Sequence, residues 1–375
     1  MVDYIILGQG ICGSWMGYYL LKEGKSIMVI DNEAPFTASR IASGVINPVT
    51  GRRVVKTWMI DEIMDFASNA YTQFQEVHQA KIIKQTNILS FHATQQMKDA
   101  HDTRLPNQLN FLHIPENEAQ WEAYFNYRFG ITEVSPAWLV DMPNFVVNAR
   151  ETFIKNNCYL NTEFKWEDCI VTNDYVEYKG IKASKIICCE GAAGAADNPY
   201  FTLLPYAKNK GEVLIMSIPD LPRDHIYKQN ITITPWKEDL FWVGSSYEWN
   251  FSDDKPSATF RIKTELQLQQ WLKLRYSVRE HISALRPANL ERRPFTGVHP
   301  HHPAVAILNG MGTKGCSLSP YFAHQLTQHL VNDSTILPEA DVNRFTKVLA
   351  RGSVRLFYLG NLCTNNPYKF LLYAF

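Results

Sequence analysis

Hydrophobic residues at the start of the chain form two short runs separated by an amphipathic segment. Val2–Leu7 is almost wholly apolar and ends in a glycine, which is typical of a buried parallel strand. Ser14–Lys22 carries an apolar face at helical spacing and is closed by Gly24, so a helix is predicted there. Ser26–Ile30 is a second apolar run, with Asp31 at its end. The pattern predicts a strand, a turn, a helix and a second strand.

Two later apolar runs each end in a glycine-rich segment. Lys185–Cys189 leads into Glu190–Gly194, and Ala304–Leu308 leads into Gly310–Gly315. This continuous apolar character is that of buried parallel strands, so both runs are grouped with the N-terminal α/β segment. Helices are predicted over Thr57–Gln79, Pro143–Asn156, Phe260–Arg275 and Ser319–Leu330.

Between these segments the pattern changes to that of antiparallel strands. β structure is predicted over Ile82–His92 and Gly211–Trp249, and Leu105–Asn117 is predicted to be a loop. The order predicts an α/β fold, in which a discontinuous Rossmann-like nucleotide-binding domain carries an inserted second domain of antiparallel β-sheet and helices. The first domain is assigned residues 1–81, 141–212 and 285–351, the second residues 82–140 and 213–284, and the tail 352–375 no role.

The composition is that of a globular protein without a highly charged partner. The chain has 375 residues, enough for two domains, and a hydrophobic fraction of 46%. Its 37 basic residues balance 37 acidic ones, which argues against nucleic acid or an anionic membrane as a partner. No apolar run reaches the roughly 18 residues that a membrane span needs, and the chain begins directly with a strand. We expect a cytoplasmic protein.

Neither the cysteines nor the histidines have the spacing of metal ligands. The seven cysteines are spread along the chain, and this pattern favours buried, reduced thiols. The run His299–Pro303 contains two prolines that force an extended backbone, and no cysteine or carboxylate lies close to it. We interpret this run as a surface turn and predict no metal site.

The turn after the first strand, Gly8–Gly13, has the sequence GQGICG. This G-x-G-x-x-G pattern follows a strand, opens a helix and precedes Asp31 by 18 positions, the arrangement of a dinucleotide-binding motif. Gly8 allows the tight turn, Gly10 lets the backbone approach a pyrophosphate, and Gly13 lets the helix pack on the strand. The helix N-terminus offers free N–H groups to the phosphates. Asp31 would accept hydrogen bonds from ribose hydroxyls and repel a 2′-phosphate.

That motif does not distinguish FAD from NAD, but four further segments favour FAD. Ser39–Gly44 follows the second strand, and Ala284–Pro287, Arg293–Gly297 and Leu308–Pro320 come far downstream. With the N-terminal motif they resemble the D-amino acid oxidase superfamily of FAD-dependent oxidoreductases. The chain is most similar to glycine oxidase and to the C-terminal oxidase half of the bifunctional enzyme that completes methylaminomethyl-uridine in tRNA. The resemblance covers residues 1–345.

The resemblance implies a non-covalent FAD site. The stretch around Ser43 would run along the isoalloxazine, Gly191 and Ala192 would end the strand beneath the cofactor, and Gly312–Gly315 would lie at the pyrimidine edge. Ala284 stands where the covalent-flavin branch has its cysteine. The predicted cofactor-binding residues are Gly8, Gly10, Ile11, Cys12, Gly13, Asp31, Asn32, Arg40, Ala42, Ser43, Gly44, Gly191, Ala192, Gly310, Gly312, Thr313, Lys314 and Gly315.

Three residues are predicted to serve catalysis. Arg286 matches the arginine that binds the substrate carboxylate in the amino-acid-oxidising branch, where the guanidinium fork suits a carboxylate. Lys314 would help to stabilise negative charge at N1 and O2 of reduced flavin, and Tyr247 would border the substrate pocket. The alternatives are a structural ion pair of Arg286 with Glu291 or another carboxylate, a solvated Lys314, and plain packing of Tyr247.

The resemblance therefore implies an FAD-dependent amine or amino acid oxidase or dehydrogenase with a small-molecule substrate. The substrate would give a hydride to flavin N5 in breaking its C–H bond, the imine would hydrolyse, and O2 would reoxidise the flavin. Three alternatives stay open. They are a tRNA-modifying oxidase acting on an aminomethyl group, an NAD-dependent dehydrogenase, and a flavin-binding protein without catalysis. The sequence gives no oligomeric state.

Overall fold

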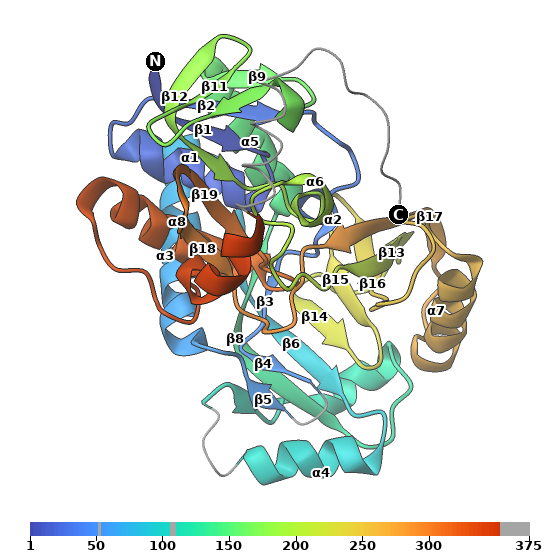
Figure 1. The fold of residues 1–375 in the computed structure, drawn as a ribbon. Coiled ribbons are helices and arrows are strands. Elements are labelled where there is room, and N and C mark those ends of the chain that lie inside the picture. Colours follow the sequence, from blue (N-terminus) through green and yellow to red (C-terminus); the bar gives the residue numbers. More distant parts are fainter. Residues whose placement is uncertain (52–53, 106–109, 353–375) are drawn as a thin grey trace.

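The chain folds around two β-sheets, which occupy the upper and lower halves of Figure 1. This computed structural model describes residues 1–51, 54–105 and 110–352. The predicted tail therefore lies outside the described residues from position 353 onward. The mixed α/β fold expected from the sequence is confirmed, since parallel and antiparallel strands occur together with helices.

The upper sheet has a parallel centre built from segments far apart in the sequence. Its parallel strands lie side by side in the order β9 (Tyr159–Asn161), β2 (Ile27–Asp31), β1 (Val2–Leu7), β12 (Ile181–Cys188) and β19 (His302–Asn309). Antiparallel strands complete it: β18 (Phe295–His299) on β19, and the hairpin of β10 (Cys169–Val171) and β11 (Val176–Tyr178) on β12. The three predicted buried strands β1, β12 and β19 are thus direct neighbours.

Helices cover one face of this sheet and shorter elements cover the other. The helical layer consists of α1 (Ile11–Lys22), α3 (Ile60–His78), α5 (Met142–Lys155) and α8 (Gly315–Asn332). Strand residues alternate between the two sides: Ile6 packs with the helices, whereas Ile5 packs with Phe201 and Tyr178 on the far side. Trp15 of α1 is fully buried among aromatic rings of the helical layer.

The lower sheet is mainly antiparallel. Its order is β17 (Ser277–Arg286), β13 (Asn209–Ser217), β16 (Leu240–Gly244), β15 (Thr232–Pro235), β14 (His225–Lys228), β6 (Ile83–Phe91), β8 (Ile131–Val140) and β3 (Val45–Ile46), with β7 (Leu112–His113) also on β8. Only β14 and β6 pair in parallel among these described strands. Its flanking helices are α4 (Gln95–Arg104) and α7 (Ala258–Trp271), and β4 (Val49–Thr50) and β5 (Val55–Lys56) form a separate hairpin.

The remaining elements are short. They are the helices α2 (Ala38–Ile41) and α6 (Gly194–Asp197) and the 3-10 turns Glu118–Ala123, Trp166–Asp168 and Val342–Phe345. Strands β13 and β17 both extend across predicted domain boundaries, and β3 joins the lower sheet from within the first predicted segment. The domain limits themselves stay a prediction.

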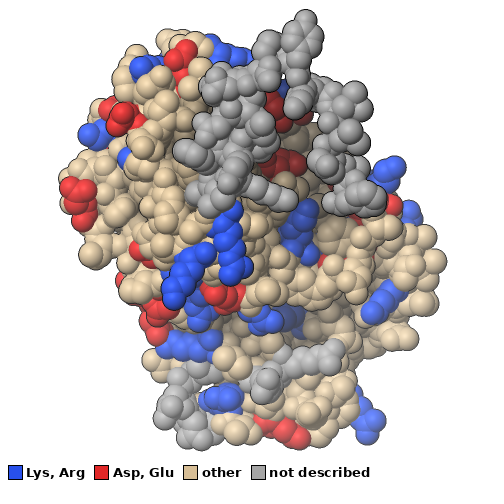
Figure 2. Space-filling view, in the orientation of Figure 1, with Lys and Arg blue, Asp and Glu red and all other residues tan. Residues whose placement is uncertain are grey.

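Two surface properties bear on partners. None of the helices in the described ranges is long and apolar enough to span a bilayer. Lys and Arg side chains gather across the middle of the face shown in Figure 2, although the whole chain has a net charge of zero. Positive charge is therefore concentrated on part of this face.

Candidate active site

A cavity of about 670 Å³ lies where the two sheets meet. The upper sheet contributes residues that follow its parallel strands, among them Gly8, Asp31 and Gly191. The lower sheet contributes Trp242 of β16 and Arg286 of β17. A position outside the carboxyl ends of parallel strands is where open α/β sheets bind nucleotides, so the fold places a cofactor-sized space at the expected edge.

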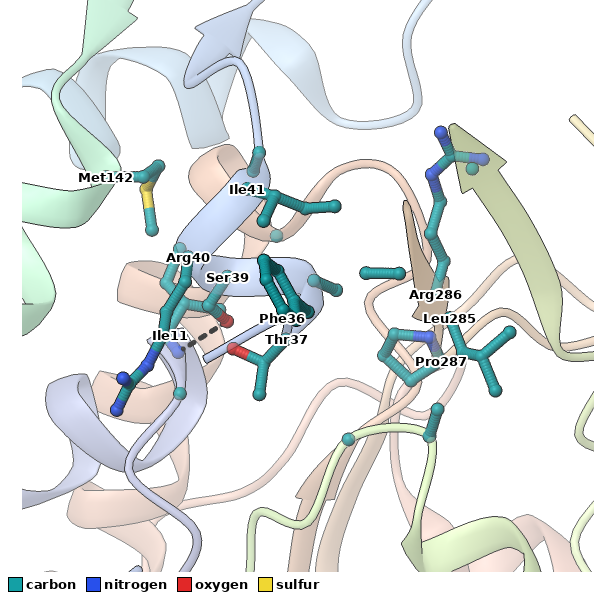
Figure 3. A pocket seen from close by; sticks show the side chains of 18 of the residues that line it. Ile11, Phe36, Thr37, Ser39, Arg40, Ile41, Met142, Leu285, Arg286 and Pro287 are labelled. Atoms are coloured by element: carbon teal, nitrogen blue, oxygen red, sulfur yellow. Dashed lines mark hydrogen bonds between the residues drawn. The ribbon is translucent and has the colours of Figure 1, made fainter. Parts of the chain in front are cut away.

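Two helix N-termini face this cavity. Ile11 at the start of α1 and Gly315 at the start of α8 both line it, and a Cβ at Gly315 would lie 3.4 Å from Ile11 Cγ2. The Ile11 amide donates a hydrogen bond of 2.9 Å to Ser39 Oγ (Figure 3). Neither N-cap residue, Gly10 or Lys314, supplies a side-chain acceptor to its helix. Adjacent positive helix ends favour a negatively charged ligand such as a pyrophosphate.

The three glycines of the N-terminal motif have different surroundings. Gly8 has φ +92°, and a Cβ there would lie 2.7 Å from the Cys189 carbonyl oxygen. A Cβ at Gly13 would overlap the carbonyl oxygen of Gly8, so this glycine allows α1 to pack on the turn. A Cβ at Gly10 would meet only Ser39, with 3.0 Å to its Oγ. Gly10 therefore keeps the cavity side of the turn open.

Asp31 is fixed by the backbone of the neighbouring turns. One carboxylate oxygen accepts a hydrogen bond from the Gln9 amide and the other from the Glu33 amide, both at 2.8 Å. Arg40 lies 3.8 Å from the same carboxylate. Because each carboxylate oxygen can accept a second hydrogen bond, Asp31 retains capacity for ligand hydroxyls. Asn32 instead accepts from the Ala34 amide and does not line the cavity.

The cavity brings most of the predicted cofactor-binding residues together. Those in its wall are Gly8, Gly10, Ile11, Cys12, Asp31, Arg40, Ala42, Ser43, Gly191, Ala192, Gly312, Thr313 and Gly315. Those outside its wall are Gly13, Asn32, Gly44, Gly310 and Lys314. Gly44 is needed for packing instead, since its Cβ would overlap the Val140 carbonyl oxygen and its φ is +79°.

Arg286 lies in the cavity wall opposite Ser39 and Ile11 (Figure 3). Its Nη1 donates to Asn209 Oδ1 at 2.6 Å and to the Ser246 carbonyl oxygen at 3.1 Å, and its Nη2 donates to Ser245 Oγ at 2.7 Å. All three acceptors are neutral. No carboxylate pairs with this guanidinium within the residues that the structure describes, and burial lowers its pKa from the ordinary value.

The alternative ion pair of Arg286 with Glu291 does not form. Glu291 instead accepts from Arg344 Nε at 3.0 Å. The other two predicted catalytic residues lie outside the cavity wall. Tyr247 is 51% exposed, with its ring centre 5.4 Å from Arg286 Cζ. Lys314 donates to Thr57 Oγ1 at 3.1 Å, and burial lowers its pKa to about 8.

Several residues of the wall were not singled out from the sequence. Ser39, in contact with the α1 N-terminus, lies within the segment that carries the resemblance. Glu190 directly follows a buried strand. Burial raises the pKa of its carboxyl to about 7, although hydrogen bonds from Asn198 and Trp166 act in the opposite direction. Trp242 Nε1 donates to the Ile41 carbonyl oxygen at 2.8 Å. The position of Glu190 directly after a strand could have identified it as a wall residue from the sequence. Trp242 reaches the wall only through long-range packing, which the sequence does not reveal.

The thiols of the wall are unreactive. Cys12, Cys189 and Cys316 all line the cavity and are buried. Burial raises the pKa of the Cys12 and Cys316 thiols to about 12, and that of Cys189 also lies well above its ordinary value. These groups are protonated at neutral pH and are therefore weak nucleophiles. With Ala284 also in the wall, the described residues present no activated thiol for a covalent flavin link.

Solved structures of two oxidases and a dehydrogenase share this fold. Iminodiacetate oxidase from Chelativorans sp. BNC1 superposes with a TM-score of 0.74 at 16% identity, covering 90% of this chain and 98% of that chain. Glycine oxidase from Bacillus cereus ATCC 14579 has a TM-score of 0.74 at 16% identity, with 89% and 96% covered. L-proline dehydrogenase from P. horikoshii has a TM-score of 0.71 at 15% identity, with 92% and 98% covered. These likenesses concern the fold.

Sequence comparison gives a short match to a curated protein and a long match to a family. The uncharacterized oxidoreductase YurR of Bacillus subtilis (strain 168) is 38% identical over 58 residues, which is 16% of this chain and 16% of that protein. The DAO family, described as FAD dependent oxidoreductase, matches residues 3–329. This match confirms the resemblance seen in the sequence and decides for FAD over NAD as the cofactor. The chain belongs to the DAO family of FAD dependent oxidoreductases.

Proposed function

We propose that this flavoenzyme oxidises the C–N bond of a small amino acid whose carboxylate binds Arg286. The single observation that carries the proposal is the guanidinium in the cavity wall, held by Asn209, Ser245 and Ser246 without an acidic partner among the described residues. A desolvated cation without a counter-ion is costly, so a ligand carboxylate would be a favourable partner. Asn209 and Ser245 orient the fork that would receive it.

The named structural relatives support a substrate of this kind. Iminodiacetate, glycine and L-proline, which appear in their names, each carry an amine and a carboxylate. A carboxylate on Arg286 would fix one end of such a molecule at the lower-sheet side of the cavity. The helix N-termini of α1 and α8 would hold the cofactor phosphates on the other side.

The proposed reaction is a two-electron oxidation of the amino acid, which gives up a hydride and a proton. FAD held by the N-termini of α1 and α8 would supply a two-electron acceptor for the substrate hydride, and O2 would then take up these two electrons with two protons and be reduced to hydrogen peroxide. The substrate, having lost a hydride and a proton, becomes an imine, and water hydrolyses the imine to a carbonyl compound and an amine. Arg286 contributes by orienting the reacting C–H bond, and the cavity wall contributes by limiting access of water.

The test is a titration of the oxidised holoenzyme with glycine, L-proline and simple carboxylates, followed by the visible flavin spectrum. Wild type should show saturable spectral shifts, and Arg286→Ala should bind each carboxylate at least about 30-fold more weakly, equivalent to roughly 2 kcal/mol or more for a desolvated pair. Arg286→Lys keeps the charge and loses the fork, so it should restore little of the affinity. Arg261→Ala, an exposed arginine of α7, is the matched control.

Two results would contradict the proposed binding of a substrate carboxylate to Arg286. Equal affinity in wild type and Arg286→Ala would show that the arginine is not the carboxylate anchor. No spectral response to any carboxylate would point to an amine substrate without an acid group. Substrates that give a response are then assayed with O2, where one hydrogen peroxide per imine is expected. Reduction of an artificial acceptor without peroxide would indicate a dehydrogenase.

A further inference from the structure

A second cavity, of about 210 Å³, lies in the lower half of the molecule. Strands β6 and β8, helix α4, the end of β14 and the segment around the β4–β5 hairpin enclose it, and these elements are grouped at the bottom of Figure 1. It shares no lining residue with the larger cavity. The polar residues that line it among those described are Asn47, Ser90, His101, Lys228, Gln229 and Asn230.

Lys228 is the one cation of this lining within the described residues. It is the last residue of β14, and its side chain makes no hydrogen bond or ion pair with any residue that the structure describes. Burial lowers its pKa from the ordinary value of a lysine. A lysine that is partly buried and unpaired in the folded protein is a favourable partner for a ligand that supplies the opposite charge.

His101 of α4 has a second unpartnered polar atom in the same wall. Its Nδ1 is buried and has no hydrogen-bond partner, and its ring lies 4.6 Å from that of His92. Burial first, and then the nearby His92 and Lys228, lower its pKa to about 4. His101 is therefore neutral at physiological pH, when one ring nitrogen carries a proton and can donate a hydrogen bond.

Neutral hydrogen-bonding side chains complete the polar part of the wall, and acidic ones are missing from it in the described residues. Asn47, Ser90, Gln229 and Asn230 each carry a donor, whereas no aspartate or glutamate lines the cavity. A second lysine lies behind Asn47: Lys314 donates to Thr57 Oγ1, which in turn donates to the Asn47 carbonyl oxygen at 3.2 Å. Burial and, secondarily, Lys228 lower the pKa of Lys314.

We infer that this cavity is an anion site, in which the Lys228 ammonium, with His101, Asn47 and Ser90 as neutral donors, binds a carboxylate or phosphate group. Among its described residues the cavity wall offers one cation, several neutral donors and no acidic competitor, the donor set that suits such oxyanions. A volume of about 210 Å³ suits a phosphate or a short dicarboxylate and is too small for a nucleotide. The site is independent of the proposed amino acid oxidation.

Thermal unfolding of the holoenzyme in inorganic phosphate tests this assignment, with sodium chloride at equal ionic strength as the reference. Because ligand bound only to the folded state stabilises it, wild type should show a saturable rise in Tm, about 2 °C at ten times Kd. Lys228→Met removes the charge and keeps the length of the stem, so it should raise the phosphate Kd at least tenfold. Lys263→Met, an exposed lysine of α7, should respond as wild type does.

The variant is expected to fold, since Lys228→Met removes an unpaired charge rather than a contact, and its Tm without phosphate should equal or exceed that of wild type. Ser90→Ala gives a second measurement, with a several-fold weaker phosphate response. No saturable response in wild type, or an equal response in Lys228→Met, would overturn the assignment.

One further variant and one further probe separate this site from the carboxylate site. Arg286→Ala should keep the rise in Tm with phosphate while losing the carboxylate-induced shift of the flavin spectrum. The two proposals can therefore fail independently of each other, and the two measurements distinguish the failures. A phosphate response that depends on Arg286 and not on Lys228 would overturn the second site. Glutarate distinguishes a carboxylate from a phosphate as the bound anion. A saturable rise in Tm that is lost in Lys228→Met and kept in Arg286→Ala would show that the site also takes carboxylates, and no such rise would restrict it to phosphate.

Discussion

Gly211 lies so close to Arg286 that a Cβ on the glycine would overlap the guanidinium. The two residues belong to the paired strands β13 and β17, where Gly211 is opposite Ala284 and Arg286 is opposite Asn209. The missing side chain therefore makes the room that the guanidinium occupies in the cavity wall. A single methyl group at this position is expected to test the arginine's role without removing it.

Gly211→Ala should fold and bind FAD, because the atom in the way is the far end of a flexible side chain. The displaced guanidinium should lose its bonds to Asn209 and Ser245, and carboxylate affinity should fall about tenfold, or roughly 1.4 kcal/mol. Titration of the flavin spectrum measures this. In an Arg286→Ala background the same substitution should have no further effect, and an additive loss would contradict the explanation.

The flavin should be released on denaturation. Burial keeps the three cavity thiols protonated, and Ala284 offers no nucleophile, so heat or acid should separate a yellow compound from the polypeptide. Absorbance of the supernatant after precipitation measures the released fraction. Flavin that remains with the precipitated chain would show a covalent link and refute the expectation.

Two glycine substitutions should separate cofactor binding from folding. Gly10→Val would fill the open side of the turn, so we expect an apoprotein of nearly native fold with FAD affinity lowered about 10–100-fold. Gly13→Ala would press on the Gly8 carbonyl oxygen, so we expect a loss of about 1–3 kcal/mol in the free energy of unfolding. Flavin occupancy and Tm are measured for both. Full occupancy in Gly10→Val would refute the placement of the phosphates.

Glu190 should make stability depend on pH. Burial raises the pKa of this carboxyl to about 7 in the folded protein, above its unfolded value, so the folded state holds the proton more tightly. Its contribution is complete below about pH 4.5 and is lost as pH rises to about 7, by about 1–3 kcal/mol. Glu190→Gln should flatten the Tm profile between about pH 4.5 and 7. An unchanged slope would show that other groups set it.

The sequence was sufficient to predict those helices and strands that are determined by the local pattern of hydrophobic and polar residues. The continuous apolar runs of β1, β12 and β19, and the glycines that follow them, identified the parallel centre of the sheet and most of the cofactor wall. The observed starts of two helices differ from the predicted ones by only three residues: α3 begins at Ile60 rather than Thr57, and α1 begins at Ile11 rather than Ser14. The family resemblance, which rests on the N-terminal motif and four further segments, was confirmed.

Features that depend on pairing between distant segments could not be predicted from the sequence. Nothing in the local pattern of β14 indicates that it lies parallel to β6, or that Lys228 at its end faces His101 of α4 across a cavity. The sequence places Lys314 at the expected flavin edge, but it gives no sign that the Lys314 ammonium donates a hydrogen bond to Thr57, and its role toward the flavin stays a prediction. Side-chain direction at a loop is set by its tertiary neighbours, which a single sequence does not reveal.

The position of β12 between β1 and β19 also governs when the enzyme can acquire its cofactor. These three neighbours come from residues 2–7, 181–188 and 302–309, and the second helix end that faces the cavity begins only at Gly315. Such high contact order slows folding, because long loops must close before the contacts that reward them. On the ribosome, a nascent chain can complete the wall of its flavin site only after Gly315 has emerged. We therefore expect FAD to bind after these distant strands have paired rather than to nucleate the fold.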